Sequence, residues 1–212
     1  MEIETLILSP FQTNTYLISK NGRVLVIDPA DEGERIGNKV AREGKEVSLI
    51  IATHAHPDHI MGVKNLRRIF PAPFYLHQED LFLLKGEFNE WTPLFIDQEI
   101  EHPTHLFKDE EILNWEGEEI KILHTPGHTP GSIVIMIQEY LFSGDTLFCG
   151  SVGRADLPGG NWEKLKSSLK KLFQIEGDYF IYPGHGPPTF IEEERINNPY
   201  VQEALKEGEW SP

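Results

Sequence analysis

The chain is poor in cysteine and in basic residues, and both shortages limit what it can be. A single cysteine, Cys149, excludes an internal disulfide and leads us to expect a cytoplasmic protein. Lys and Arg number 19 against 34 Asp and Glu, which gives a net charge of −15. Such a surface repels nucleic-acid phosphates and anionic lipids, so nucleic acid is disfavoured as a partner, although bound dications would add local positive charge.

Long apolar runs and an export signal are also missing. No uninterrupted apolar stretch approaches the length of a membrane span, so we expect no membrane partner. The first residues, MEIETLILSPFQ, carry acids where a secretory signal carries Lys or Arg, and they are expected to form a strand of the mature protein. The length suits one domain over residues 1–212 with a substantial core. The sequence contains no signal for an oligomeric state.

Strand and helix patterns come in two similar sets. Strands are expected at 2–8, 13–19, 23–29, 48–52 and 73–77, with Asn21-Gly22 as a hairpin turn, then as a meander over 104–144 (HLFK, EILNW, EEIKILH, SIVIMIQ, YLFSGD) and in DYFIYPGH. Helices are expected at 32–43, 60–70, 78–85 and 161–173 and in a short tail. The two sets predict an α/β fold, an αββα sandwich of two mixed β-sheets packed face to face with helices on the outside. The loop 86–103 is either a flap over the ligand edge or a surface loop that packs its own aromatic residues.

The densest group of metal-binding residue types lies in THAHPDH, residues 53–59. It places His54, His56, Asp58 and His59 directly after the apolar run SLIIA. Side chains two apart in extended chain point to the same side, so His54 and His56 can reach one metal, while the following turn can direct Asp58 and His59 to a second position. One loop can therefore serve two ions.

Three further apolar runs each end on a glycine followed by a metal-binding residue type. They are IKILHTPGH, ending on His128, YLFSGD, ending on Asp145, and YFIYPGH, ending on His185. Ligands gather where loops leave strand ends in layered α/β proteins, so these residues can converge with those of THAHPDH. Five His and two Asp suffice for two divalent ions. Without cysteine the set suits zinc, iron or manganese, and it leaves room for water or substrate.

The remaining candidates are weaker. Asp28 ends its strand and either orients the first ligand loop or starts the turn. His124 can line the pocket without being a ligand, and Cys149 has no base nearby in sequence and is interpreted as a small apolar residue. Three other histidines are expected to be hydrogen-bonded or on the surface: His77, His102 and His105.

The seven ligand candidates together resemble the metallo-β-lactamase superfamily. THAHPDH is similar to the HxHxDH motif of that family, and the later His, Asp and His stand in the family's order. The resemblance implies two divalent metal ions, with zinc the first choice. It implies that one ion is held by His54, His56 and His128 and the other by Asp58, His59 and His185, with Asp145 bridging them.

Within the superfamily, HTPGHTPGS and SGDTLFCGSVGRADLPGG look most like glyoxalase II, the hydroxyacylglutathione hydrolases, especially their short bacterial relatives. True β-lactamases generally lack the bridging Asp and are exported, and flavodiiron reductases carry Glu where His56 stands. Full-length glyoxalase II has a helical extension that helps to grip glutathione, whereas only 27 of the 212 residues follow His185. Arg154 either pairs with a substrate carboxylate or forms an internal salt bridge with Asp156.

The resemblance implies a hydrolase for a small-molecule thioester of the S-(2-hydroxyacyl)glutathione type. A metal-bridging hydroxide would attack the carbonyl carbon, and Asp58 and Asp145 would orient it and move its proton. One alternative is a persulfide dioxygenase with a single iron, which SVGRAD also resembles. The others are a metal-dependent nuclease, which the acidic charge disfavours, and a metal-binding scaffold without catalysis.

Overall fold

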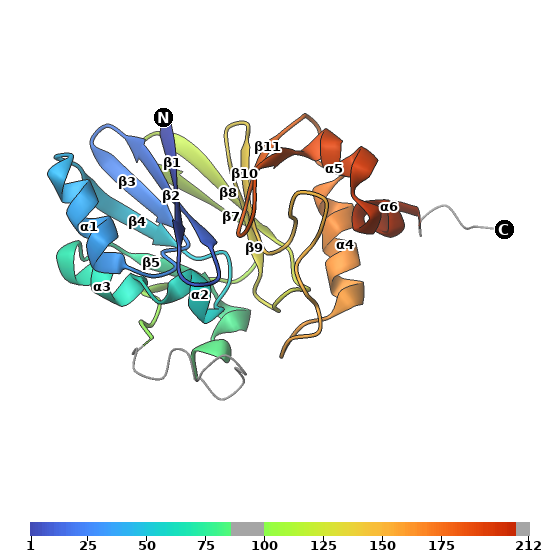
Figure 1. Ribbon diagram of the computed structural model, residues 1–212, viewed down its shortest axis with the longest axis horizontal. Coiled ribbons are helices and arrows are strands. Elements are labelled where there is room, and N and C mark those ends of the chain that lie inside the picture. The colour runs from blue at the N-terminus through green and yellow to red at the C-terminus, as the bar shows by residue number, and fades with distance from the viewer. Residues whose placement is uncertain (86–99, 207–212) are drawn as a thin grey trace. The chain divides into compact units, whose positions relative to one another are not determined.

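The computed structural model describes residues 1–85 and 100–206. Most of the loop 86–103 lies outside the described residues, so both interpretations of it stay predictions. The chain divides into two compact units, Met1–Lys108 and Asp109–Pro212, and its organisation as one domain also stays a prediction. Each unit contains one six-stranded mixed β-sheet with helices (Figure 1), which confirms the predicted α/β class.

The sheet of the first unit has the strand order β1-β2-β3-β4-β5-β6. Strands β1 to β3 pair antiparallel, whereas β3 to β6 pair parallel. The predicted hairpin is confirmed, because Asn21 and Gly22 connect β2 to β3 with φ angles of 52° and 77°, the left-handed values that a tight hairpin turn requires. The strands are β1 (Glu2–Leu8), β2 (Thr13–Lys20), β3 (Arg23–Ile27), β4 (Glu46–Ile51), β5 (Phe74–His77) and β6 (His105–Phe107).

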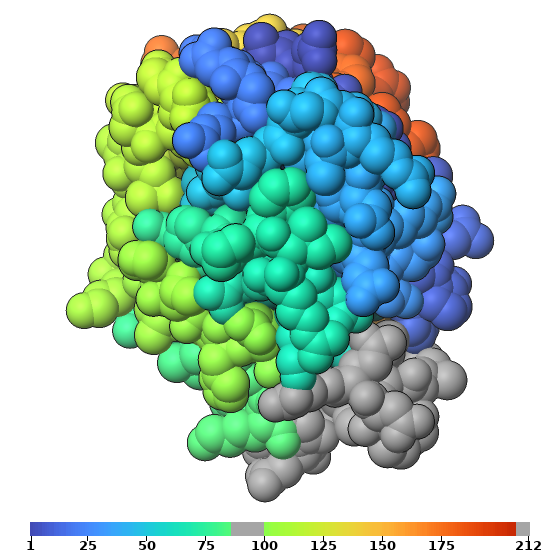
Figure 2. All heavy atoms as spheres, turned by 90° about the vertical axis from the view of Figure 1, so that its left-hand side faces the viewer, coloured from blue at the N-terminus to red at the C-terminus, as the bar shows by residue number. Residues whose placement is uncertain are grey.

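Helices α1 (Gly33–Arg42) and α3 (Val63–Ile69) lie side by side in the first unit, and Figure 2 looks onto them, with α1 in blue and α3 in blue-green. Glycine permits this close approach, since a Cβ on Gly37 would lie 2.7 Å from the side chain of Ile69. The apolar sides of both helices join strand residues in one buried cluster, to which the helices contribute Ile36, Val40, Val63 and Leu66.

The predicted helix over 60–70 is interrupted in the structure. A single turn, α2 (Pro57–Ile60), precedes α3. Between them the backbone N–H of Gly62 donates to the carbonyl of Pro29 at 2.8 Å, and a Cβ on Gly62 would lie 2.7 Å from the same oxygen. The chain approaches Pro29 too closely here for a regular helix with side chains to continue.

The predicted helix over 78–85 is also wrong in form. The structure has two short 3-10 helices there, η1 (Gln78–Asp80) and η2 (Leu83–Lys85). The Asp80 carboxylate accepts a hydrogen bond from the backbone N–H of Ala55 at 2.9 Å. This tertiary hydrogen bond connects η1 to the loop 53–59. Because the tertiary contact outweighs local helix propensity, no continuous α-helix forms over residues 78–85.

The sheet of the second unit has the order β12-β11-β10-β9-β8-β7. Strands β7 to β10 form the predicted antiparallel meander, and β10 pairs parallel with β11. The meander does not include HLFK, because β6 pairs parallel with β5 in the first sheet, where the rings of His105 and Tyr75 stack at 4.5 Å. The strands are β7 (Glu111–Trp115), β8 (Glu118–His124), β9 (Ile133–Ile137), β10 (Tyr140–Gly144), β11 (Phe180–Pro183) and β12 (Thr189–Phe190).

Helix α4 (Trp162–Leu172) begins as predicted after Asn161, whose side-chain oxygen accepts a hydrogen bond from the Lys164 N–H at 2.9 Å. Its apolar face packs into the core of the second unit through Leu165, Leu169 and Leu172. Burial of each leucine side chain contributes about 1.5–3 kcal/mol to the stability of the fold. The predicted helical tail forms α5 (Ile191–Asn197) and α6 (Pro199–Lys206). Across residues 1–85 and 100–206, no helix has the length and apolar character needed to span a membrane.

Candidate metal centre

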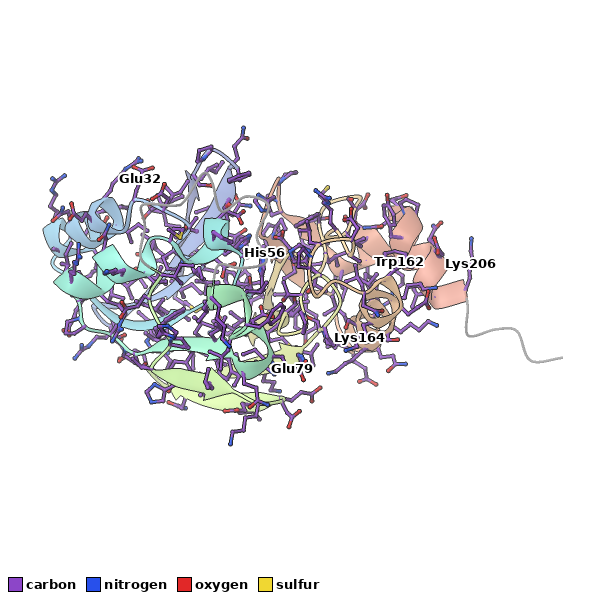
Figure 3. The ribbon with its side chains drawn as sticks, turned by 90° about the horizontal axis from the view of Figure 1, so that it is seen from below. Glu32, His56, Glu79, Trp162, Lys164 and Lys206 are labelled. Atoms are coloured by element: carbon purple, nitrogen blue, oxygen red, sulfur yellow. The ribbon has the colours of Figure 1, made fainter. Side chains whose placement is uncertain are left out.

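The loop after β4 brings four predicted ligands together. The rings of His54 and His56 have centroids 4.8 Å apart, and those of His54 and His59 are 4.1 Å apart. Asp58 follows in the first turn of α2, where its Oδ2 lies 3.6 Å from Nε2 of His59. The three histidines are buried and Asp58 is partly exposed, and Figure 3 labels His56 in this unit. Within the first unit, these four side chains therefore lie close together, and their role as metal ligands stays a prediction.

Asp28 holds this loop in place. Its carboxylate accepts hydrogen bonds from the N–H and the hydroxyl of Thr53, both at 2.7 Å, and from Nδ1 of His59 at 2.9 Å. A histidine that donates from Nδ1 presents Nε2 as a lone-pair donor, the tautomer that a metal requires. Asp28 also has a turn conformation, with φ of 49°. Asp28 was interpreted either as a residue that orients the loop 53–59 or as the start of a turn. The structure supports the first interpretation, and the turn conformation of Asp28 accompanies it.

Sequence reasoning missed two supporting residues of the same unit. The Thr13 hydroxyl, at the start of β2, donates to Oδ2 of Asp58 at 3.0 Å. Asp80, already noted in η1, fixes the backbone of Ala55 between two ligands. Thr13 and Asp80 are buried and lie 45 and 25 residues from their partners in the chain, so no local pattern marks them.

The second unit groups the other three predicted ligands. Oδ2 of Asp145 lies 3.4 Å from Nε2 of His128 and 3.6 Å from Nε2 of His185. The residues follow β10, β8 and β11, which are strands of one sheet. Gly184 donates its N–H to the carbonyl of Gly144 at 2.8 Å, which joins the loops that carry Asp145 and His185. One oxygen of Asp145 therefore faces both imidazoles.

Gly153 is a further residue that the sequence analysis did not identify. A Cβ at this position would lie 1.8 Å from the carbonyl oxygen of Asp145 and 3.0 Å from Nδ1 of His128. The next carbonyl, that of Arg154, accepts a hydrogen bond from His128 Nδ1 at 2.7 Å. The glycine in SVGRAD thus lets the chain pack against two predicted ligands, Asp145 and His128, and orient the second of them.

The Arg154 side chain forms the salt bridge that was one of its two interpretations. Its guanidinium makes two hydrogen bonds of 2.9 Å to the Asp156 carboxylate, and both side chains are exposed. The Arg154 hydrogen bonds lower the pKa of Asp156 below its ordinary value. A role for Arg154 in substrate binding stays a prediction.

The remaining histidines and the cysteine have the environments expected of residues outside a metal centre. His77 is buried, and its Nδ1 accepts from the backbone N–H of Glu79. His124 forms a 2.8 Å hydrogen bond with the carbonyl of Pro130. Three residues are exposed: His102, His105 and Cys149.

The donor set fits divalent metal ions. Two ligands about 2.1 Å from a tetrahedral ion are separated by about 3.4 Å. The three nitrogen-to-oxygen distances measured within the units, at 3.4, 3.6 and 3.6 Å, are close to that value. Imidazole and carboxylate donors suit zinc, iron and manganese. The side chains of each unit are thus spaced as ligands of common ions.

Comparison with known proteins assigns the family. Residues 8–185 match the model of the metallo-beta-lactamase superfamily, so the chain belongs to this superfamily of metal-dependent hydrolases, as its sequence predicted. A relative from Haemophilus influenzae named hydroxyacylglutathione hydrolase GloC is 34% identical over 209 residues, covering 95% of this chain and 98% of the relative.

Two solved structures are similar in both fold and sequence. The crystal structure of BLEG-1, titled a B3 metallo-beta-lactamase, superimposes with a TM-score of 0.87 at 33% identity, covering 94% of this chain and 99% of the other. The protein TTHA1623, solved in a di-iron-bound form, gives a TM-score of 0.80 at 36% identity, covering 93% and 99%. These similarities support the metallo-β-lactamase fold and divalent metals.

Proposed function

We propose that this protein is a dinuclear metal hydrolase whose substrate is a thioester of the S-(2-hydroxyacyl)glutathione type. The observation that carries the proposal is the match to the Haemophilus influenzae hydroxyacylglutathione hydrolase, which extends over 98% of that relative. The relative is thus of nearly the same length as this chain. A long helical extension after the last ligand is therefore not needed by a protein with that name.

The proposed metal positions follow the superfamily resemblance of the seven ligand candidates. One ion would be held by His54, His56 and His128, the other by Asp58, His59 and His185, and Asp145 would bridge them. The position of one Asp145 oxygen 3.4 and 3.6 Å from two imidazoles supports the bridging role. Zinc is our first choice, and iron is the alternative that the di-iron form of TTHA1623 supports.

Two divalent ions held by these residues would supply an activated water, with a pKa lowered to about 7, and would polarise the thioester carbonyl. The chain's own residues prepare this chemistry. Asp28 fixes His59 in the metal-binding tautomer, and the Thr13 hydroxyl holds one oxygen of Asp58. Asp58 is partly exposed, which allows its carboxylate to exchange a proton with solvent. Asp58 and Asp145 are accordingly our candidates for orienting the nucleophile and moving its proton.

The test combines metal analysis with a hydrolysis assay. The purified protein should contain two divalent ions per chain and hydrolyse S-lactoylglutathione. His54→Ala and Asp145→Ala should each lose about a thousandfold or more in turnover while keeping the circular dichroism spectrum of the parent. His102→Ala, which removes an exposed histidine, is the matched control. Substantial activity in the first two variants would refute the proposal.

A second candidate is hydrolysis of a β-lactam, which the similarity to BLEG-1 over 99% of its chain favours. A chromogenic cephalosporin assayed beside the thioester separates the two, because the better substrate has the higher kcat/KM. A third candidate, oxidation of a glutathione persulfide, requires dioxygen. It would be supported by one iron per chain together with oxygen consumption, an outcome that would exclude the dinuclear hydrolase.

A further inference from the structure

A pocket of about 450 Å³ lies in the second unit, outside the seven predicted ligands. One wall is the end of β8 and the loop that follows it, with His124 and Pro126, and the other is α4. Figure 3 labels Trp162 and Lys164 at the beginning of this helix. The helix lines the pocket with Glu163, Lys164, Ser167, Ser168 and Lys171.

The spacing of the α4 residues produces a continuous polar stripe. Positions 164, 167, 168 and 171 follow one another at i, i+3, i+4 and i+7, so they share one face of the helix. A rise of about 1.5 Å per residue separates the two lysines by about 10 Å along the axis. The pocket is therefore lined by a lysine towards each end and by two serines between them. The serine hydroxyls donate to the carbonyls of Glu163 and Pro126 at 2.9 and 2.7 Å.

The charges near the pocket leave one cation in excess. Glu163 pairs with Lys166 at 2.9 Å, and Lys171 pairs with Glu110. In the part of the chain that the structure describes, Lys164 has no ion-pair partner. Although the protein has a net charge of −15, α4 has a local excess of positive charge, with four lysines and one glutamate. The excess positive charge favours an anion at Lys164.

The opposite wall is held by hydrogen bonds. Ser168 donates its hydroxyl to the carbonyl of Pro126 at 2.7 Å, and Lys171 donates to the carbonyl of His124 at 2.9 Å. His124 is further fixed by its 2.8 Å contact with Pro130. Pro126 and His124 are thus held in place before a ligand binds, which reduces the entropic cost of binding.

We propose that this pocket binds a small organic anion, an acidic group on an apolar body. The acidic group pairs with the ammonium group of Lys164, and the apolar body lies against Pro126 and His124. Carboxylates and phosphate monoesters both have this chemistry. The volume falls within the usual range of small-molecule sites, about 300–1,000 Å³. This inference does not depend on the proposed hydrolase activity.

The experiment titrates the metal-loaded, full-length protein with two aromatic probes, benzoate and phenyl phosphate. Acetate and inorganic phosphate, which carry the same acidic groups without an apolar body, are the control probes. Backbone amide signals of residues 163–171 report binding by NMR. The aromatic probes should bind and should distinguish a carboxylate site from a phosphate site by their relative affinities. Lys164→Gln should weaken the affinity about tenfold or more. Lys170→Gln, the same charge change on the same helix outside the pocket lining, should leave it unchanged.

Three outcomes would overturn the proposal. The first is an equal loss of probe affinity in Lys164→Gln and Lys170→Gln. The second is an affinity for acetate or inorganic phosphate that matches the affinity for the aromatic probes. The third is the absence of saturable binding of any probe up to about 10 mM. Anions can also bind metal ions, so the titration is repeated with His54→Ala. Persistence of the α4 shifts in this variant supports the pocket, and their loss would contradict it whatever the catalytic activity proves to be.

Discussion

Nδ1 of His59 donates to Oδ2 of Asp28 at 2.9 Å, and the same oxygen accepts the Thr53 hydroxyl at 2.7 Å. Asp28→Asn keeps the shape of the side chain but replaces one accepting oxygen with an amino group. We expect metal affinity to fall about 10–100-fold, because His59 loses its fixed orientation. Competition with a chromophoric chelator measures this affinity. Asp156→Asn, which neutralises an exposed carboxylate, is the control and should leave the metal affinity unchanged. An unchanged metal affinity in Asp28→Asn would contradict the role given to Asp28.

Removal of the metal should lower the thermal stability of the protein. A ligand that binds only the folded state, at a free concentration of about 100 times its Kd, stabilises that state by about 2.7 kcal/mol. For a chain of this size, this stabilisation raises the Tm by about 5–10 °C. Differential scanning calorimetry with and without a chelator measures the shift. His54→Ala should show a smaller chelator-dependent shift than the parent protein. Identical shifts in the two would mean that His54 is not a ligand.

Gly153→Ala should damage the metal centre through steric overlap. The added methyl group would lie 1.8 Å from the carbonyl oxygen of Asp145, so the loop must move, at a cost of about 1–3 kcal/mol. Both the Tm and the metal affinity should fall. Gly44→Ala is the control, because its φ of 68° makes alanine strained while no neighbouring atom lies within 4 Å. It should lower the Tm and leave metal affinity intact.

Glu194 stabilises the connection between the C-terminal helices and the loop after Asp145. Its buried carboxylate accepts hydrogen bonds from the Thr189 hydroxyl, the Gly150 N–H and the Asn198 amide at 2.7, 2.8 and 2.8 Å. Glu194→Gln turns an amino group towards one of these donors and should cost about 1–3 kcal/mol in urea unfolding. The exposed neighbour variant, Glu193→Gln, should change the free energy of unfolding much less. An equal loss of unfolding free energy in Glu194→Gln and Glu193→Gln would contradict a stabilising role for the buried hydrogen bonds of Glu194.

The acid side of the stability profile should include a contribution from Glu43. A hydrogen bond from Lys39, followed by one from Lys45, lowers the pKa of Glu43 below its ordinary value of 4.5. Because the folded-state pKa is the lower one, the stabilisation is present above pH 4.5 and is lost as the pH falls through the folded-state pKa. Glu43→Gln should therefore have a lower Tm than the parent at neutral pH, and the difference should shrink as the pH falls below 4.5 and vanish below the folded-state pKa of Glu43. Glu203→Gln, which removes an exposed carboxylate of α6, serves as the control, and its Tm at neutral pH should differ less from that of the parent.

Local patterns allowed much of the fold to be predicted. The hairpin at Asn21-Gly22 and the cap at Asn161 depend on the conformational preferences of one or two residues, and both are confirmed. The break at Gly62 and the pairing of β6 with β5 were missed. Both depend on partners far away in the sequence, the carbonyl of Pro29 and the strand at Tyr75, which hydrophobic periodicity does not encode.

The sequence by itself determined which donor types are present, since imidazole and carboxylate side chains are the groups that zinc, iron and manganese prefer. It also determined the spacing of the four ligands in THAHPDH, because they share one loop. Only the tertiary structure decided which residues support them. Thr13, Asp28 and Gly153 reach their partners across strands and loops, and such contacts arise from packing, which brings together residues that no short segment can hold in register.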